Sequence, residues 1–324
     1  MAITELEPHQ PPSQPSMPTL AEERLLTPEM VEVGYFALIW RRLRRDRVAM
    51  IGAALVVLIA LAAIFAPFLA PHDPAEQFRD GLTPAGQPVP STLLSDGGWR
   101  FPLGTDSNGR DLLSRILHGA RISLTVGVLA NALAVALGVM IGSVAGYFGG
   151  WFETILMRFS DIMMAFPTLL LAMALVAILK PSLWIIIVVI GLVYWTWIAR
   201  VAYGQVLALR ERDFVTASRA LGAGRRATLF RHILPQLIPT IIVWGTLGIA
   251  TNVMLEASLS YLGIGVQPPT PSWGGMIQQG QSYYRTAPWM VIFPGLAIMI
   301  TVFAFNLLGD GLRDALDPTQ RGRF

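Results

Sequence analysis

The chain has 324 residues, of which 53% are hydrophobic and only 14% are charged, with a formal net charge of +3 and a mean hydropathy of +0.54. Soluble domains carry about a quarter charged residues, so this composition excludes a soluble protein and predicts a multi-span membrane protein. The chain contains no cysteine, which excludes disulfides, thiolate nucleophiles and thiolate metal sites.

The positive charge belongs mainly to arginines beside apolar segments, where such residues orient a chain in a bilayer. No nucleic-acid partner is therefore expected. The only lysine, Lys180, follows Leu179. Because a phosphate-binding P-loop requires a Gly-Lys pair at the start of a helix, ATP-driven work would need another subunit. We expect no cofactor and no metal on this chain.

The start of the chain divides into two parts. Residues 1–30 contain six prolines, a composition typical of a disordered segment. From Val31 on, apolar residues such as Tyr35 and Trp40 are interleaved with the arginines of residues 41–45. This pattern predicts an amphipathic interfacial helix or, equally, the cytoplasmic cap of the first span. We assign residues 31–70 to this helix and the first transmembrane helix.

Six uncharged windows are long enough to cross a bilayer, for which about 20 apolar residues are needed. They are residues 48–70, 122–152, 162–179, 181–199, 233–255 and 286–309. Five arginines within residues 41–47 place the N-terminus in the cytoplasm. Alternation then assigns 71–115 to an external segment, 116–310 to the main transmembrane domain, and 311–324 to a cytoplasmic tail.

The external segment contains one patterned stretch before the second window. Asp106, Asn108 and Gly109 favour a turn, and Asp111 is expected to cap a short helix that runs through Leu117. The Asp-x-Asn spacing is similar to a calcium loop. Leu117 stands where the twelfth-position acid of such a loop is required, so we do not predict a calcium site.

A stripe of glycines marks the second window. The spacing of four places its members on one helical face, where a second helix can approach closely. We favour packing within this chain over a contact between subunits. The stripe comprises Gly138, Gly142, Gly146 and Gly150.

A few polar residues lie near the ends of the later windows. Arg158 and Asp161 are three residues apart and are expected to pair, and Pro167 is expected to kink the third span. Glu256 lies about 32 Å from Pro235 along a helix, near the outer face. With Tyr261 it is a candidate for the translocation path or a gate, although a paired or hydrated interfacial acid is commoner.

The segment 200–235 is the most basic part of the chain, with seven arginines against two acids. Its own arginines and the alternation of spans both place it in the cytoplasm, where it predicts a docking surface. Enzyme motifs are missing: there is no GxSxG, no HExxH and no pair of acids deep in a window. We therefore predict a non-catalytic protein.

The stretch TASRALGAGRRATLFRHILP resembles the EAA loop in the membrane subunits of binding-protein-dependent ABC importers. That pattern reads E-A-A, three residues, Gly, nine residues, then I-x-L-P. It falls here on Thr216, Ala217 and Ser218, then on Gly222, and finally on His232, Leu234 and Pro235. The spacing is intact, while Thr216 replaces the glutamate and His232 the isoleucine.

Other stretches narrow the resemblance to the C-type permease of dipeptide and oligopeptide importers. They are RRLRRDRVAMIG, APHDP, PLGTDSNGRDLLSR and LEASLSYLGIGVQPPTPSWGGM, and the similarity covers residues 36 to 316. It implies an all-α membrane protein with six transmembrane helices in the type I ABC importer permease (MetI-like) fold. It also implies an N-terminal interfacial helix, a cytoplasmic coupling helix at about 213–222, and a bacterial inner membrane location with both termini cytoplasmic.

The same resemblance implies partners and coupling residues. The partners are a homologous B-type permease, two cytoplasmic ATPase subunits that bind ATP and Mg, an external solute-binding protein, and lipid. Phe214, Val215, Ala217, Ser218 and Leu221 are expected to form an apolar face, Gly222 a tight exit turn, and Pro235 the return into the bilayer. A solvated amphipathic helix is the alternative. The residues assigned to coupling are Asp213, Phe214, Thr216, Ala217, Ser218, Arg219, Leu221, Gly222, Leu234 and Pro235.

The sequence hypothesis is the translocation subunit of an ATP-driven importer, with di- and oligopeptides as the leading substrates. Similar permeases serve nickel chelates and glutathione. The alternative is an ion-coupled secondary transporter or channel that acts without ATPases, although such carriers normally show charged or broken spans at mid-depth.

Overall fold

The computed structural model describes residues 35–91 and 100–316. The predictions for residues 1–30, and for the tail from residue 317 onward, fall outside these ranges. The chain separates into two compact units, residues 1–38 and 39–324. Helix α2 (Tyr35–Leu43) begins in the first unit, and the other described helices belong to the second.

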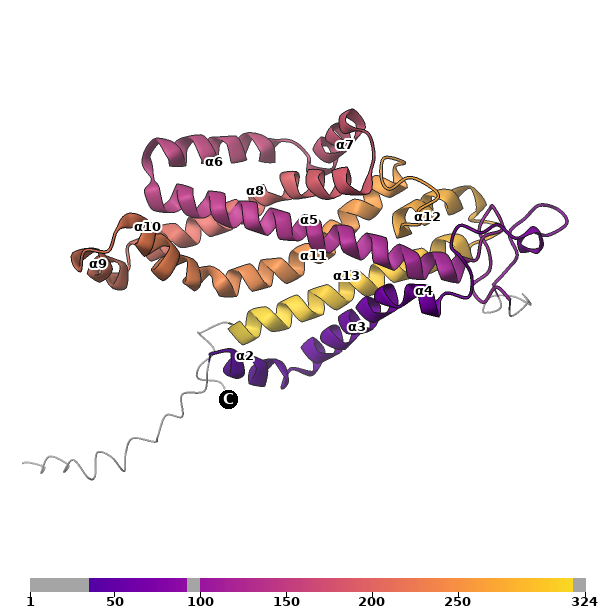
Figure 1. Cartoon of the computed structure of the whole chain (residues 1–324), viewed down its shortest axis with the longest axis horizontal. Helices are drawn as coiled ribbons and strands as arrows, with labels where there is room; N and C mark the ends of the chain where they lie inside the picture. Colours follow the sequence, from indigo (N-terminus) through magenta and orange to yellow (C-terminus); the bar gives the residue numbers. More distant parts are fainter. Residues whose placement is uncertain (1–34, 92–99, 317–324) are drawn as a thin grey trace, which may run out of the picture. The chain divides into compact units, whose positions relative to one another are not determined.

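Helices make up nearly all of the regular structure in the described residues, alongside two isolated β-bridges. The long helices are α3 (Arg47–Ile64), α5 (Leu112–Phe148), α6 (Gly150–Ala165), α7 (Thr168–Leu179), α8 (Leu183–Arg210), α11 (Ile238–Tyr261) and α13 (Trp289–Leu316). The short elements are α4 (Ala66–Leu69), a 3₁₀ turn (Arg79–Gly81), α9 (Asp213–Ala220), α10 (Arg225–Thr228), α12 (Trp273–Gly280) and a 3₁₀ turn (Gln281–Tyr283). Figure 1 shows their arrangement.

Five helical segments among the described residues are long and apolar enough to cross a membrane, and a bent pair gives a sixth. The bent pair is α6 with α7, whose axes meet at 92°. Pro167 lies in the break between them, because its ring and missing N–H prevent the helix from continuing. Each predicted window overlaps one of these six segments. The kink expected at Pro167 is therefore a sharp corner.

Helices α5 and α8 form the closest helix pair of the second unit. Gly138, Gly142 and Gly146 face α8, and a methyl group added at Gly138 would lie only 2.7 Å from Ile198 Cβ. Since the glycines carry no side chain, the two backbones can approach closely along three turns. Gly150 does not take part, contrary to the expectation of a four-residue stripe. Helix α5 ends at Phe148, and Gly149 and Gly150 turn the chain with φ of +66° and +64°.

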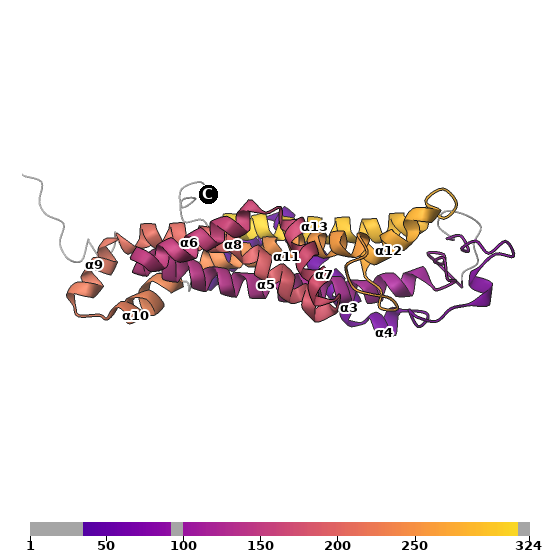
Figure 2. The ribbon, with the colours of Figure 1, turned by 90° about the horizontal axis from the view of Figure 1, so that it is seen from above.

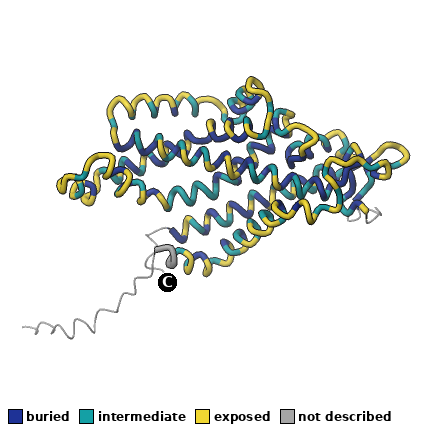
Figure 3. Tube along the Cα trace, in the orientation of Figure 1, coloured by how far each residue is buried: buried dark blue, intermediate teal, exposed yellow. Residues whose placement is uncertain are grey.

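Helix α8 is the most buried of the spanning helices, whereas α3, α6 and α7 expose many apolar side chains (Figure 3). Helix α13 packs against α3 and α11, and α11 also packs against α5. The exposed apolar faces are those that a bilayer or a second membrane subunit would cover.

The fifth span is longer than its window. A continuous helical segment runs from Arg225 to Tyr261, and it passes through a π-helical turn (Leu229–Ile233) and a 3₁₀ turn (Leu234–Leu237) before α11. The change of helix type accommodates Pro235, which cannot donate the usual backbone hydrogen bond. Pro235 therefore lies within a continuous helical segment, and its assignment as the return into the bilayer stays a prediction. The turn between α9 and α10 lies earlier, at Gly222 to Gly224.

The ends of the helices gather in two places within the second unit. Helices α9 and α10 lie with the turn between α5 and α6 at one end, and α12 lies with the segments 70–91 and 100–111 at the other (Figures 1 and 2). These are the two ends that the alternation of spans assigns to opposite sides of the membrane. We call them the α9 end and the α12 end.

Candidate functional site

Helix α9 has the position and length expected of a coupling helix. It covers Asp213–Ala220, against the prediction of about 213–222. The helix ends because Gly222 adopts φ of +86°, a left-handed conformation that favours glycine. A side chain at Gly222 would meet nothing within 4 Å. The glycine is therefore required by the backbone and not by packing.

One face of α9 is apolar and open. Leu221 is 89% exposed and Phe214 is 40% exposed, and Ala217 lies exposed between them. The three are spaced i, i+3 and i+7, which places them on one side of the helix. Asp213 and Thr216 are also exposed. This outward face, defined by Phe214, Ala217 and Leu221, is uncovered in the described residues.

The opposite face holds α9 on the rest of the unit. Val215 is fully buried in a cluster with Tyr147 of α5, Val206 of α8 and Leu229 of the π-helical turn. Ser218 lies on the same side, and its hydroxyl oxygen is shielded. Val215 and Ser218 therefore do not belong to the outward face, contrary to the expectation. The sequence alone did not show which apolar residues of this short helix face the protein and which face outward.

Two arginines strengthen this attachment. The Arg219 guanidinium lies 5.4 Å from the centre of the Tyr147 ring, a cation–π contact. Arg210, at the end of α8, donates a 3.0 Å hydrogen bond to the Gly146 carbonyl oxygen. Helix α9 thus rests on the joined ends of α5 and α8. Leu234, also assigned to coupling, packs against the Val215 cluster, whereas Pro235 is exposed.

Glu256 lies inside the protein. It is fully buried, and it accepts hydrogen bonds from Ser123 of α5 at 2.8 Å and from Ser260 at 2.7 Å. In this structure the acid joins α5 and α11 instead of facing an open passage. Tyr261 is 43% exposed at the end of α11.

Asp161 pairs as expected, and with two partners. Its carboxylate lies 4.0 Å from Arg158, and it also pairs with Arg200 of α8. Arg200 is one of the arginines of the basic segment, and the sequence offered no reason to choose it. Because Arg200 lies on α8, this pair ties α6 to α8.

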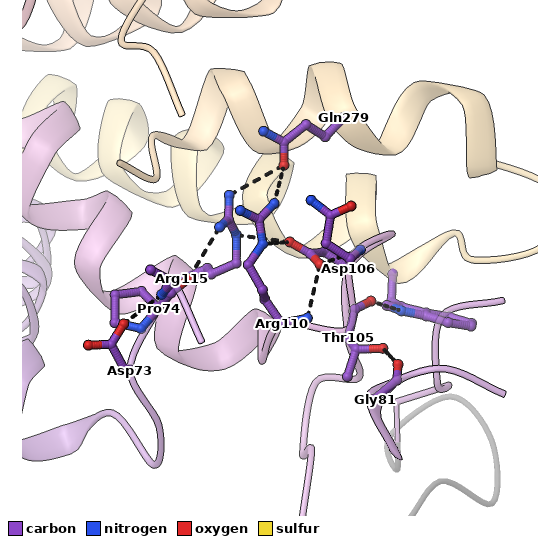
Figure 4. Close-up of polar contacts among 11 residues, drawn as sticks. Asp73, Pro74, Gly81, Thr105, Asp106, Arg110, Arg115 and Gln279 are labelled. Atoms are coloured by element: carbon purple, nitrogen blue, oxygen red, sulfur yellow. Dashed lines mark hydrogen bonds and ion pairs between the residues drawn. The ribbon is translucent and has the colours of Figure 1, made fainter. Parts of the chain in front are cut away.

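A buried polar cluster at the α12 end was missed by sequence reasoning. Asp106 binds Arg110 Nε at 2.7 Å and lies 3.3 Å from Arg115 Nε (Figure 4). Both arginines also donate to Gln279 Oε1 of α12, at 3.2 and 3.3 Å. The spacing of four residues between Asp106 and Arg110 could have indicated their ion pair. No local pattern in the sequence indicates that Gln279 joins them.

Asp111 caps a helix as predicted, with its carboxylate accepting from Ser114 N at 2.9 Å. The helix is not short: it is α5, which continues for 37 residues through the second span. Asp106 is occupied by arginines, so its oxygens are not free for calcium. Among the described residues, no group of three or more acids and histidines could hold a metal.

Two family models match the chain. Residues 138–322 match the binding-protein-dependent transport system inner membrane component, and residues 34–85 match the N-terminal transmembrane domain of oligopeptide transport permease C.

The chain aligns with curated relatives over most of their length. The dipeptide transport system permease protein DppC of Escherichia coli (strain K12) is 48% identical over 279 residues, covering 86% of this chain and 91% of that protein. The di/tripeptide transport system permease protein DppC of Pseudomonas aeruginosa (strain UCBPP-PA14) is 42% identical over 279 residues, covering 86% and 90%. The glutathione transport system permease protein GsiD of Shigella flexneri serotype 5b (strain 8401) is 43% identical over 298 residues, covering 92% and 95%.

A solved structure supports the fold. An inward-facing form of the MetNI methionine ABC transporter superposes with a TM-score of 0.53 at 18% identity, covering 63% of this chain and 96% of that chain. At this identity the likeness concerns the fold alone. The chain therefore belongs to the family of binding-protein-dependent transport system inner membrane components, and it is an ABC importer permease homologous to the dipeptide and glutathione permeases.

Proposed function

We propose that this chain is the translocation subunit of an ATP-driven importer of di- and oligopeptides, coupled to partner ATPases through α9. The observation that carries the proposal is the two-sided character of α9. Its inward side is fixed by Val215 and Arg219, while its outward side leaves Phe214 and Leu221 exposed among the described residues. An apolar helix face on a fixed support is suited to a groove on another protein.

The support beneath α9 suggests how motion is transmitted. Helices α5 and α8 are locked by close backbone contact at Gly138, Gly142 and Gly146. A densely packed pair resists internal deformation, so a push on α9 moves both helices together. The segment Arg225–Tyr261 follows directly, because it begins just after the turn at Gly222. Alternating access then arises when these helices move against a homologous B-type permease.

In this proposal the chain has no catalytic role of its own. Two cytoplasmic ATPases bind ATP and Mg and supply the energy, and an external solute-binding protein delivers the solute. The α9 end then faces the cytoplasm, as do both termini. The peptide assignment rests on relatives that are named for dipeptides, and one relative is named for glutathione. Specificity would reside mainly in the external binding protein.

The test compares two identical substitutions at opposite ends of the unit. Leu221→Asp places a charge on the outward face of α9, and Leu262→Asp places one at the end of α11, where Leu262 is 46% exposed. Exposed positions tolerate such changes within about 0.5 kcal/mol, so both variants should insert and fold. We expect Leu221→Asp to lose the ATPases during copurification and to lose ATP-driven uptake, whereas Leu262→Asp keeps the ATPases.

Retention of the ATPases and normal uptake by Leu221→Asp would refute the role assigned to α9. Solute flux from the purified chain in vesicles without ATPases would favour the ion-coupled alternative. The solute itself can be identified by purifying the chain with its native partners and analysing the small molecule on the external binding protein.

A further inference from the structure

A polar cavity of about 200 Å³ lies at the α12 end, between the start of α5, the end of α11, the following loop and α12. Its wall includes polar residues from each of these elements, namely Gln267, Gln278, Gln279, Ser260, Thr270 and Arg115. This composition differs from the apolar contacts that fill the rest of the unit. We call it the glutamine pocket.

Arg115 is the charged residue in the wall of the glutamine pocket, and Arg110 lies beside it on the shared carboxylate of Asp106. Arg115 is 1% exposed and Arg110 is 4% exposed, and Asp106 is the carboxylate that binds both. Asp106 is fully used, because its other oxygen accepts from the backbone nitrogens of Asn108 and Arg110. Two buried guanidinium groups thus share one carboxylate.

The nearby acids do not balance this charge directly. Asp111 is directed at Ser114, with His72 at 3.7 Å. Glu256 lies behind the wall, where it accepts hydrogen bonds from Ser260 and Ser123. The remaining partners of Arg115 are neutral oxygens, those of Pro74 at 3.2 Å and Gln279 at 3.3 Å. These oxygens satisfy hydrogen bonds without supplying charge, so Arg115 retains the capacity to attract a carboxylate.

We propose that the glutamine pocket receives the carboxylate end of a small solute, with Arg115 as the attracting group and the glutamine amides around the adjoining peptide unit. The inference rests on the proposed function for its choice of peptides as the solutes. The volume supports one end of a short peptide, because whole drug-sized ligands occupy pockets of roughly 300–1,000 Å³. Amide side chains both donate and accept, which suits a peptide group.

The test uses a probe that differs only at the carboxylate. Saturation-transfer NMR would compare alanyl-alanine with its C-terminal amide, using the membrane complex of permeases and ATPases in lipid nanodiscs. We expect the acid to bind about tenfold more tightly than the amide, because a charge-assisted hydrogen bond is lost with the amide.

The variants leave the buried arginines in place, since their removal could unfold the segment. Gln278→Glu puts a competing carboxylate in the pocket wall and should abolish the preference for the acid. Gln281→Glu makes the same change three residues further on, at an exposed position outside the wall, and should preserve it. Gln278→Leu removes the amide without adding charge and should keep the acid preference while weakening both probes.

Equal binding of acid and amide would overturn the proposal, as would equal effects of Gln278→Glu and Gln281→Glu. Loss of binding-protein docking in Gln278→Glu, without any signal from alanyl-alanine, would also overturn it and identify the pocket as a socket for an acidic side chain of that protein. The NMR readout is independent of α9. The ATPase test can therefore refute the coupling proposal while the NMR result supports the pocket, and the NMR result can refute the pocket while the ATPase test supports coupling.

Discussion

The contact between α5 and α8 gives a prediction whose size follows from interatomic distances. We consider Gly138→Ala, which adds one methyl group in the middle of the helix pair. The methyl carbon would lie 2.7 Å from Ile198 Cβ and 2.8 Å from the Trp195 carbonyl oxygen. Ordinary contact begins at 3.4 Å. Because both neighbours belong to or adjoin the α8 backbone, no rotamer change can relieve the overlap.

Two energies oppose each other in this variant. Overpacking of a well-packed contact costs about 1–3 kcal/mol, whereas alanine gains up to about 1 kcal/mol over glycine in a helix. The expected net loss of unfolding free energy is about 1–2 kcal/mol. Gly204→Ala, in α8 itself, is the matched control, because its methyl group would meet nothing within 4 Å. The control should be neutral or more stable by about 0.5–1 kcal/mol.

The measurement is reversible unfolding in mixed micelles, with both variants prepared in parallel. We expect Gly138→Ala to be the less stable of the two by about 1.5–3 kcal/mol. A Gly138→Ala protein as stable as the Gly204→Ala protein would show that α5 and α8 are not held in close backbone contact.

Two further predictions concern the two ends of the unit. Asp106→Asn leaves Arg110 and Arg115 buried without a carboxylate and should cost about 3–5 kcal/mol, seen as early proteolysis within residues 100–111. Asp80→Asn breaks an ion pair that is more than half exposed and should change stability by less than about 1 kcal/mol; equal sensitivity would refute the role assigned to burial. Val215→Ala should cost about 1–3 kcal/mol and speed hydrogen exchange across Asp213–Ala220, whereas Thr216→Ala, on the exposed side, should leave exchange unchanged. Unchanged exchange in both variants would show that Val215 does not anchor α9.

The helices were predictable because an uncharged apolar window of about 20 residues matches the thickness of a bilayer. Their ends were less predictable. Helix α5 begins at Leu112, ten residues before its window, because Arg115 finds partners inside the protein and so can enter a helix that the charge count excludes. The fifth segment begins at Arg225 for a similar reason: helical backbone continues where the side chains are charged but exposed.

The position of α9 was predictable from its resemblance to a known loop, and the orientation of its side chains was not. Val215 and Leu221 look equally apolar in the sequence, yet one is buried and the other is 89% exposed. The difference arises because Val215 packs against residues that are distant in sequence, such as Tyr147 at the end of α5. The cluster at Arg115 was hidden for the same reason, since Gln279 lies 164 residues away.

The helical segment Arg225–Tyr261 has a mechanical consequence. At about 1.5 Å per residue its 37 residues extend for roughly 55 Å. One extremity adjoins the exit turn of α9, and the other contains Ser260 of the glutamine pocket. If the segment tilts as one body by about 10° around its centre, each extremity travels about 5 Å, in opposite directions. A rigid segment of this kind would transmit a movement of α9 directly to the glutamine pocket, without successive rearrangements of the side chains between them.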